Sequence, residues 1–129
     1  MNRMILLGCV LAIGLLAGCT NYPMEEKIQY GNAWHVSLSE APRTYPPMVS
    51  RPMRVEVSLE EAWQMPIDLD YRFVWFTRTG SPARGSVAPS ASGGWRTVRV
   101  ESGQSVILRG SAVEIDAVDW ILELRRAKG

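Results

Sequence analysis

Cysteine and histidine are scarce in this chain, whose 129 residues include two cysteines and one histidine. Cys9 lies in the hydrophobic N-terminal segment, which we expect to be removed, so Cys19 would be the one cysteine of the mature chain. A single cysteine cannot form an internal disulfide, and structural zinc sites are mostly built from cysteine and histidine. We therefore expect no disulfide, no metal site and no bound cofactor apart from a covalent lipid.

An excess of charge of either sign is also absent. The 14 basic side chains, less Arg3 of the N-terminal segment, match the 13 acidic ones. Binding to nucleic acid depends on a concentrated positive field, which a neutral domain does not generate. We therefore expect no nucleic-acid partner.

Residue sets typical of enzymes are missing as well. A Ser-His-Asp triad would have to use His35, and no serine lies in a Gly-x-Ser-x-Gly turn. Asp68 and Asp70 are a candidate carboxylate pair, but they alternate with Arg72 along a predicted strand, which favours a solvated charged face. The sequence thus predicts a protein that is not an enzyme, and a hydrolase that uses His35 is the alternative from that class.

A secretion leader is present at the N-terminus. The basic start at residues 1–3 precedes an apolar run from Met4 to Ala17, which at about 14 residues is shorter than the ~20 that span a bilayer. The run ends in Leu-Ala-Gly-Cys at residues 16–19, which resembles the lipobox of bacterial lipoproteins. This resemblance implies that residues 1–18 are removed as a signal peptide and that Cys19 carries acyl chains such as palmitate. An ordinary secreted protein with a free Cys19 thiol is the alternative.

The residue after the cysteine bears on the location of the protein. Lipoproteins with aspartate at that position tend to stay in the inner membrane, whereas this chain has Thr20, so we expect the periplasmic face of the outer membrane. Residues 19–31 are mostly polar, and we interpret them as the lipidated cysteine and a flexible tether. Residues 32–129 have the length of one domain with one core.

Alternation of apolar and polar residues is the main structural signal. Val55, Val57 and Leu59 share one face of a strand that begins at Arg54. The pattern is longest in the strand predicted at 67–77, where these residues share a face: Ile67, Leu69, Tyr71, Phe73 and Trp75. A period of two over about ten residues fits a β-strand and not a helix.

Further strands are predicted at 34–38, 95–100, 104–109 and 120–125, and at 113–115 in the alternative with seven strands. Glu-Ser-Gly at residues 101–103 fits a hairpin loop with Gly103 in the left-handed conformation, which would place Val98 opposite Val106. Six or seven strands without a convincing helix indicate an all-β fold, an immunoglobulin-like antiparallel β-sandwich.

Residues 81–94 form a long connection made mainly of glycine, proline, alanine and serine. Such a segment buries little, which favours a mobile connection. Long loops also carry recognition functions, so a binding role for this segment is the second interpretation.

One stretch is specific enough to indicate a family. Tyr-Arg-Phe-Val-Trp-Phe at residues 71–76, followed by Gly80, resembles the YcfL family of small bacterial lipoproteins. The likeness continues through Trp95 and ends with Trp-Ile-Leu-Glu-Leu at residues 120–124. It covers roughly residues 54–125, in addition to the lipobox.

The chain departs from the family pattern at three places. It has Glu-Glu-Ala-Trp-Gln at residues 60–64 where an asparagine-containing turn is usual, Thr77 where aspartate is usual, and a longer 81–94 connection. The resemblance implies an immunoglobulin-like lipoprotein of the cell envelope, and it implies no catalytic residue.

The phase of the tryptophans separates core from surface candidates. Trp75 and Trp120 are in phase with core residues. Trp63 lies in a predicted turn, and Trp95 is in phase with outward residues, so these two are the surface candidates for binding a partner or stacking on a sugar.

Three arginines point outward by the same alternation: Arg99, Arg109 and Arg125. They could form a basic stripe for an acidic partner or glycan, although interspersed glutamates favour a solvated face. With the membrane anchor, these residues predict a non-catalytic binding or assembly module for another envelope protein. The alternative is a protein that binds peptidoglycan or regulates its synthesis.

Overall fold

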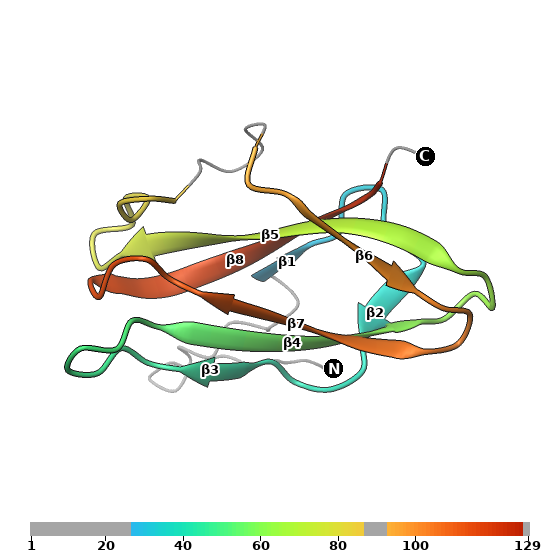
Figure 1. Ribbon diagram of the computed structural model, residues 1–129, viewed down its shortest axis with the longest axis horizontal. Helices are drawn as coiled ribbons and strands as arrows, with labels where there is room; N and C mark the ends of the chain where they lie inside the picture. The colour runs from blue at the N-terminus through green and yellow to red at the C-terminus, as the bar shows by residue number, and fades with distance from the viewer. Residues whose placement is uncertain (1–26, 87–92, 128–129) are drawn as a thin grey trace, which may run out of the picture.

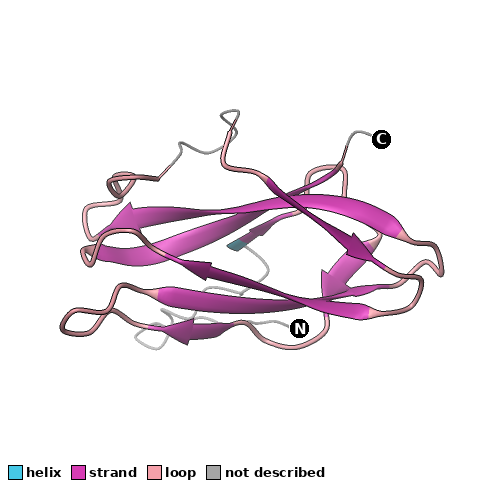
Figure 2. Cartoon of the chain, in the orientation of Figure 1, coloured by secondary structure: helices cyan, strands magenta, loops and turns pink. Residues whose placement is uncertain are grey.

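The computed structural model describes residues 27–86 and 93–127 (Figure 1). The predicted signal peptide, Cys19 and residues 87–92 of the 81–94 connection lie outside this range. The described chain forms eight strands: β1 (Ile28–Gln29), β2 (Val36–Leu38), β3 (Arg43–Tyr45), β4 (Arg54–Glu61), β5 (Ile67–Thr77), β6 (Arg96–Val100), β7 (Ser105–Ser111) and β8 (Ala117–Arg126). Figure 2 shows these strands joined by loops and turns. In the described part of the chain, no helix is long and apolar enough to cross a membrane.

The strands form two sheets that pack face to face (Figure 1). One sheet has the order β1-β8-β5-β6. The other is centred on β4, which pairs with β7 along one edge and with β2 and β3 along the other. Among the described strands, β1 and β8 run parallel and the other pairs are antiparallel. The predicted all-β sandwich is confirmed.

The two segments with the clearest alternation supply the centre of the core. Val55, Val57 and Leu59 of β4 are fully buried, as their shared phase predicts. Leu69 and Trp75 of β5 are buried in the same core cluster. Burying a side chain of this size stabilises a fold by roughly 1.5–3 kcal/mol relative to leaving it exposed, so one apolar face on each sheet holds the two sheets together.

The connection between β6 and β7 differs from the predicted hairpin. Gly103 has the predicted left-handed conformation, with φ at 71°, but Val98 lies opposite Leu69 of β5 and Val106 lies opposite Leu59 of β4. The chain therefore crosses from one sheet to the other at this turn. The predicted pairing of Val98 with Val106 is wrong, because each strand pairs with a longer central strand instead.

The folded domain begins before residue 32. Ile28–Gln29, which the sequence assigns to the 19–31 tether, form β1 and pair with Leu122 and Glu123 of β8. Ile28 is buried in the core cluster, so apolar burial holds this segment against the sheet. Residues 28–29 therefore belong to the sheet and not to the predicted tether, whose residues before Lys27 lie outside the described range.

The alternative seventh strand at 113–115 is absent. These residues lie in the turn that precedes β8, and the side chains of Val113 and Ile115 are exposed.

Residues 81–86 are integrated into the fold. The N–H of Ala83 donates a hydrogen bond to the Trp75 carbonyl at 2.8 Å, and the N–H of Trp75 donates to Ser86 Oγ at 2.8 Å. Ala83 is also buried in the core cluster. Ala83 is the one buried residue of this segment, so residues 81–86 bury little, as expected, but their hydrogen bonds hold them along the edge of β5.

Candidate functional site

An aromatic cluster lies at the end of the sandwich where β4 ends and β5 begins, at the right in Figure 1. Trp34 and Trp63 are 54% and 57% exposed, and Met65, in the same turn as Trp63, is 40% exposed. The two indole rings meet edge to face, with centroids 4.8 Å apart and planes at 75°. We call Trp34, His35, Trp63 and Met65 the tryptophan corner.

Glu61, the last residue of β4, holds the turn that carries Trp63. Its buried carboxylate accepts hydrogen bonds from the N–H groups of Trp63, of Met65 at 3.1 Å and of Gly103 at 2.7 Å. Burial acts to raise the pKa of Glu61, but the backbone hydrogen bonds from Gly103, Trp63, Met65 and Gln64 outweigh it, so the pKa is lowered. One carboxylate thus ties the turn to the β6–β7 connection.

His35 forms the buried side of the corner. Its ring stacks on Trp34 with centroids 3.9 Å apart and meets Trp63 edge to face at 5.4 Å. Its carbonyl accepts a hydrogen bond from the N–H of Ala62 at 3.0 Å, which joins the two segments that carry the tryptophans. Nδ1 of His35 has no hydrogen-bond partner among the described residues, whereas a Ser-His-Asp triad uses this nitrogen to bind its aspartate.

Trp63 is exposed, as its place in a predicted turn indicates, whereas the sequence pattern predicts Trp34 within a strand. The strand β2 begins at Val36, and Trp34 lies in the turn before it. The Gly-Asn pair at residues 31–32 signals a first turn, but Trp34 and His35 lie in a second turn, closed by a hydrogen bond from the Val36 N–H to the Ala33 carbonyl.

Trp95, the other predicted surface tryptophan, covers a charged cluster on the outer face of the β1-β8-β5-β6 sheet. Its half-buried ring contacts two guanidinium groups, with Arg72 at 4.4 Å and Arg125 at 4.0 Å from the ring centroid. Next to it, Arg72 and Glu123 form an ion pair at 2.6 Å in which both side chains are buried.

The prediction that the outward face of β5 is solvated is therefore only partly correct. Asp68 is exposed, but Asp70 and Arg72 are 8% and 4% exposed. Asp70 accepts hydrogen bonds from Thr97 at 2.6 Å and from Arg125 at 3.1 Å. Burial of these charges is possible because each is paired.

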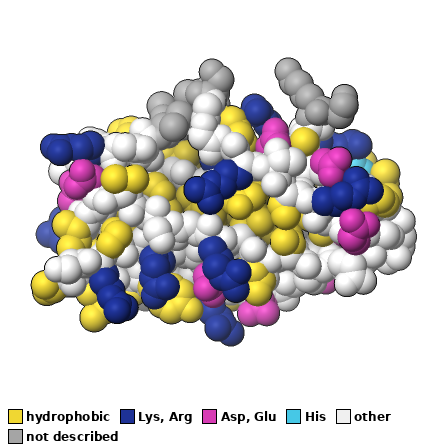
Figure 3. Space-filling model, in the orientation of Figure 1, with side chains coloured by type: hydrophobic (Ala, Val, Ile, Leu, Met, Phe, Trp, Pro, Cys, Tyr) yellow, Lys and Arg dark blue, Asp and Glu magenta, His cyan; other side chains and the backbone are white. Residues whose placement is uncertain are grey.

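The three predicted arginines do not lie in one stripe. Arg109 is on β7 of one sheet, whereas Arg99 and Arg125 are on the other sheet. Each is paired with a carboxylate: Arg99 with Asp68 at 3.2 Å, Arg109 with Glu56 at 3.2 Å, and Arg125 with Asp70 at 3.1 Å. Figure 3 shows acidic side chains next to basic ones at several places on one face.

Metal ligands do not gather in the part of the chain that the structure describes. Within residues 27–86 and 93–127, no three His, Cys, Asp or Glu side chains lie close enough to hold a metal ion.

The fold and the tryptophan corner define a small β-sandwich domain with an exposed aromatic surface at one end. Residues 35–126 match the family described as "Protein of unknown function (DUF1425)", and the chain belongs to that family. YcfL proteins are of this type, so the predicted resemblance is confirmed at the level of DUF1425. A comparison with curated proteins finds no significant match.

Two solved structures have a similar fold. The crystal structure of Campylobacter jejuni cj0090 is 23% identical in sequence, with a TM-score of 0.62, and the alignment covers 78% of this chain and 98% of that one. The crystal structure of a DUF1425 family member from Shewanella sp. pv-4 is 18% identical, with a TM-score of 0.54, and the alignment covers 73% of this chain and 78% of that one. At these identities the likeness shows the fold alone.

Proposed function

We propose that this chain is a lipid-anchored outer-membrane protein of the YcfL type, whose sandwich binds another envelope protein without catalysing a reaction. The tryptophan corner carries this proposal. Trp34 and Trp63 are more than half exposed, whereas the other tryptophans of the domain are buried or half-buried. Exposed indole rings are typical of the residues that contribute most to the binding energy of protein interfaces.

The hydrogen bonds that hold the backbone of the tryptophan corner also support a role in binding. Glu61 and the hydrogen bond from Ala62 to His35 hold the backbone of both tryptophan-bearing segments. A surface that is already ordered loses less conformational entropy when a partner binds. Met65 adds a flexible apolar side chain that can adapt to the partner.

The proposed anchor allows the corner to face away from the membrane. Cys19 is eight residues before Lys27, the first described residue, and eight residues extend at most about 28 Å. From there β1 runs parallel to β8, whose last residues pair with the beginning of β5. The chain thus runs from the tether toward the end that carries the corner.

Site-specific photocrosslinking in cells tests the proposal. A photoreactive phenylalanine analogue at position 63 of the full-length protein should give a discrete adduct with one envelope protein, and Trp34→Ala should abolish that adduct. The same analogue at Val49, an exposed residue in the turn before β4, is the matched control and should give none. Crosslinks from position 49 alone, or none from position 63, would contradict the proposal.

Peptidoglycan is the second candidate partner. Trp34 stacks on His35 with one face while the residue is 54% exposed, and a free indole face can stack on a sugar ring. Digesting the cell wall before crosslinked material is isolated separates the candidates. A protein adduct should survive the digestion, whereas a glycan adduct should be reduced to small fragments.

A further inference from the structure

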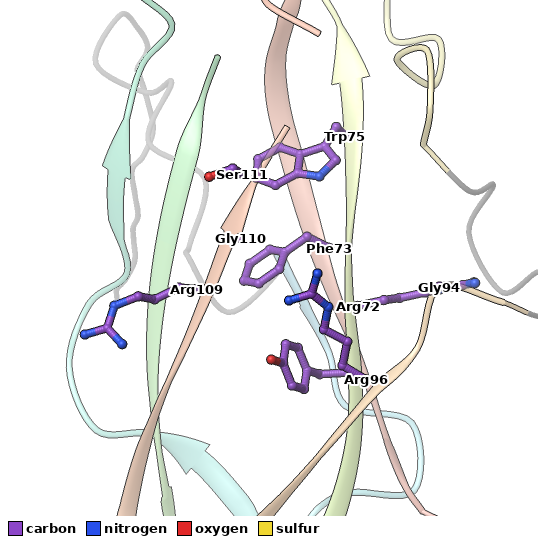
Figure 4. A pocket seen from close by; sticks show the side chains of 9 residues that line it. Arg72, Phe73, Trp75, Gly94, Arg96, Arg109, Gly110 and Ser111 are labelled. Carbon is purple, nitrogen blue, oxygen red and sulfur yellow. The ribbon is translucent and has the colours of Figure 1, made fainter. Parts of the chain in front are cut away.

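A second candidate surface lies on the open side of the sandwich, between β5 and β7 (Figure 4). It is a groove of about 380 Å³ with an aromatic floor. Tyr71 and Phe73 meet edge to face at 6.5 Å, and Phe73 stacks on Trp75 at 5.7 Å. The floor is accessible here because β6 begins at Arg96 and pairs with only the first half of β5.

The opposite wall of the groove includes the bare backbone of β7. Gly110 and Ser111 line it, and a Cβ atom at Gly110 would lie 2.4 Å from Cδ2 of Phe73. Carbon atoms that are not bonded do not approach this closely, so only glycine allows β7 to pass so near the ring. The groove therefore offers a peptide an aromatic surface on one side and main chain on the other.

The edge of β5 is unpaired at the same place. β6 pairs with β5 as far as Tyr71, and residues 81–86 resume the hydrogen bonding at Trp75. The N–H and C=O of Trp75 both point to this edge, and alternate residues of an antiparallel strand point the same way. The N–H and C=O of Phe73 therefore face this edge, where no strand of the described chain pairs with them. This gap in the pairing is one residue long, so a peptide that crosses it can form hydrogen bonds with Phe73.

The groove is basic. Three arginines and no acidic residue line it, but Arg72 is paired with Glu123 and Arg109 with Glu56. Arg96 is exposed and has no ion pair among the described residues. Figure 4 shows the Arg96 side chain reaching toward Phe73, whereas Arg109 points away from the groove. In Figure 3, hydrophobic surface between β6 and β7 is flanked by basic side chains.

We propose that this groove binds an extended, acidic peptide segment of a partner protein. The peptide backbone pairs with Phe73, its apolar side chains contact the aromatic floor, and a carboxylate pairs with Arg96. A carboxylate is the complement of an unpaired guanidinium, since the two form charge-assisted hydrogen bonds. This inference goes beyond the proposed function, because the groove and the tryptophan corner are built from different residues.

Peptide titration against the mature, lipidated protein in detergent tests the inference. The probe is a capped octapeptide of alternating valine and threonine with one central glutamate, and its counterpart has glutamine there. The glutamate peptide should bind at least tenfold more tightly than the glutamine peptide, and added salt should reduce this preference. In amide NMR spectra, the peptide should shift the signals of Phe73 and Ser111.

Two variants separate the groove from the rest of the surface. Arg96→Gln should abolish the preference for glutamate, whereas Arg99→Gln, on the outer face of the same strand, should keep it. Equal binding of the two peptides, an unchanged preference in Arg96→Gln, or a groove occupied by a second copy of the chain would overturn the inference. Trp63→Ala should leave peptide binding to the groove unchanged. A failure of the proposed function at the tryptophan corner can therefore be distinguished from a failure of this inference.

Discussion

Arg72 and Glu123 are direct neighbours in the register of β5 and β8, and Arg72 Nε donates a hydrogen bond of 2.6 Å to Glu123 Oε1. A second donor of the guanidinium, Nη1, binds the carbonyl of Gly93 at 2.7 Å. The two charged residues belong to the segments at 71–76 and 120–124 that mark the family resemblance most specifically. Part of that likeness therefore has a structural role, since it joins the two central strands of one sheet.

Replacing Arg72 with methionine should destabilise the domain strongly. The variant removes the guanidinium that is paired with the buried Glu123 carboxylate, and breaking a buried ion pair in this way costs about 3–5 kcal/mol. Urea denaturation followed by tryptophan fluorescence measures the loss. The double variant Arg72→Met/Glu123→Leu should recover most of it, because the buried carboxylate is removed together with its cation. A single variant as stable as the double one would contradict this role of the pair.

Two tryptophan variants should differ sharply in stability. Trp75→Ala removes a buried ring and should lower the free energy of unfolding by about 3–5 kcal/mol, out of the ~5–15 kcal/mol typical of a whole domain. Trp63→Ala removes a ring that is 57% exposed and should cost about 1 kcal/mol, the size of an aromatic pair contact. Thermal unfolding of both proteins checks this. Equal melting temperatures would show that the buried and exposed faces are misassigned.

Glu61 should make stability depend on pH in the acidic range. Its pKa in the folded protein is lowered from the ordinary value of 4.5, so its contribution is present above that pH and is lost as the pH falls through the folded value. Glu61→Gln should therefore be less stable than the wild type at pH 7, and the gap in melting temperature should narrow toward pH 3. A gap that stays constant over this range would exclude the carboxylate as its cause.

Lipidation can be tested at the cysteine itself. Cys19→Ala should block acylation and leave the precursor uncleaved by the lipoprotein peptidase, because the thiol that accepts the lipid is gone. Mass spectrometry of the mature protein and membrane fractionation measure both effects. Thr20→Asp, which keeps the cysteine, should move the protein to the inner membrane. An unmodified Cys19 in the mature wild type would refute the anchor.

The sequence predicted the long strands well, because each has one face in the core. Val57 and Leu69 lie where a period of two places them. The partner of β6 was not predictable in the same way, because Gly103 signals a reversal of the chain whatever strand lies next to it. Strand pairing is decided by burial between segments that are far apart in the sequence. β6 and β7 are each more stable when paired with a central strand than when paired with each other.

The exposure of a site residue could be predicted where it depends only on the local sequence around that residue. Trp63 is exposed because its own turn exposes it. The position of Trp34 beside it depends on a hydrogen bond between Ala62 and His35, and local patterns carry no information about such a contact. Arg72 alternates with apolar residues as a solvated residue would, and its burial depends on Glu123 and on the ring of Trp95 from elsewhere in the chain.

The close approach of Gly110 to Phe73 restricts how this sequence can change over evolutionary time. A larger residue at position 110 leaves no room for a phenylalanine ring at position 73, and overpacking is destabilising. The two positions should therefore covary among relatives. A lineage that loses the glycine must also shrink the ring, and with that exchange it loses the aromatic floor of the groove.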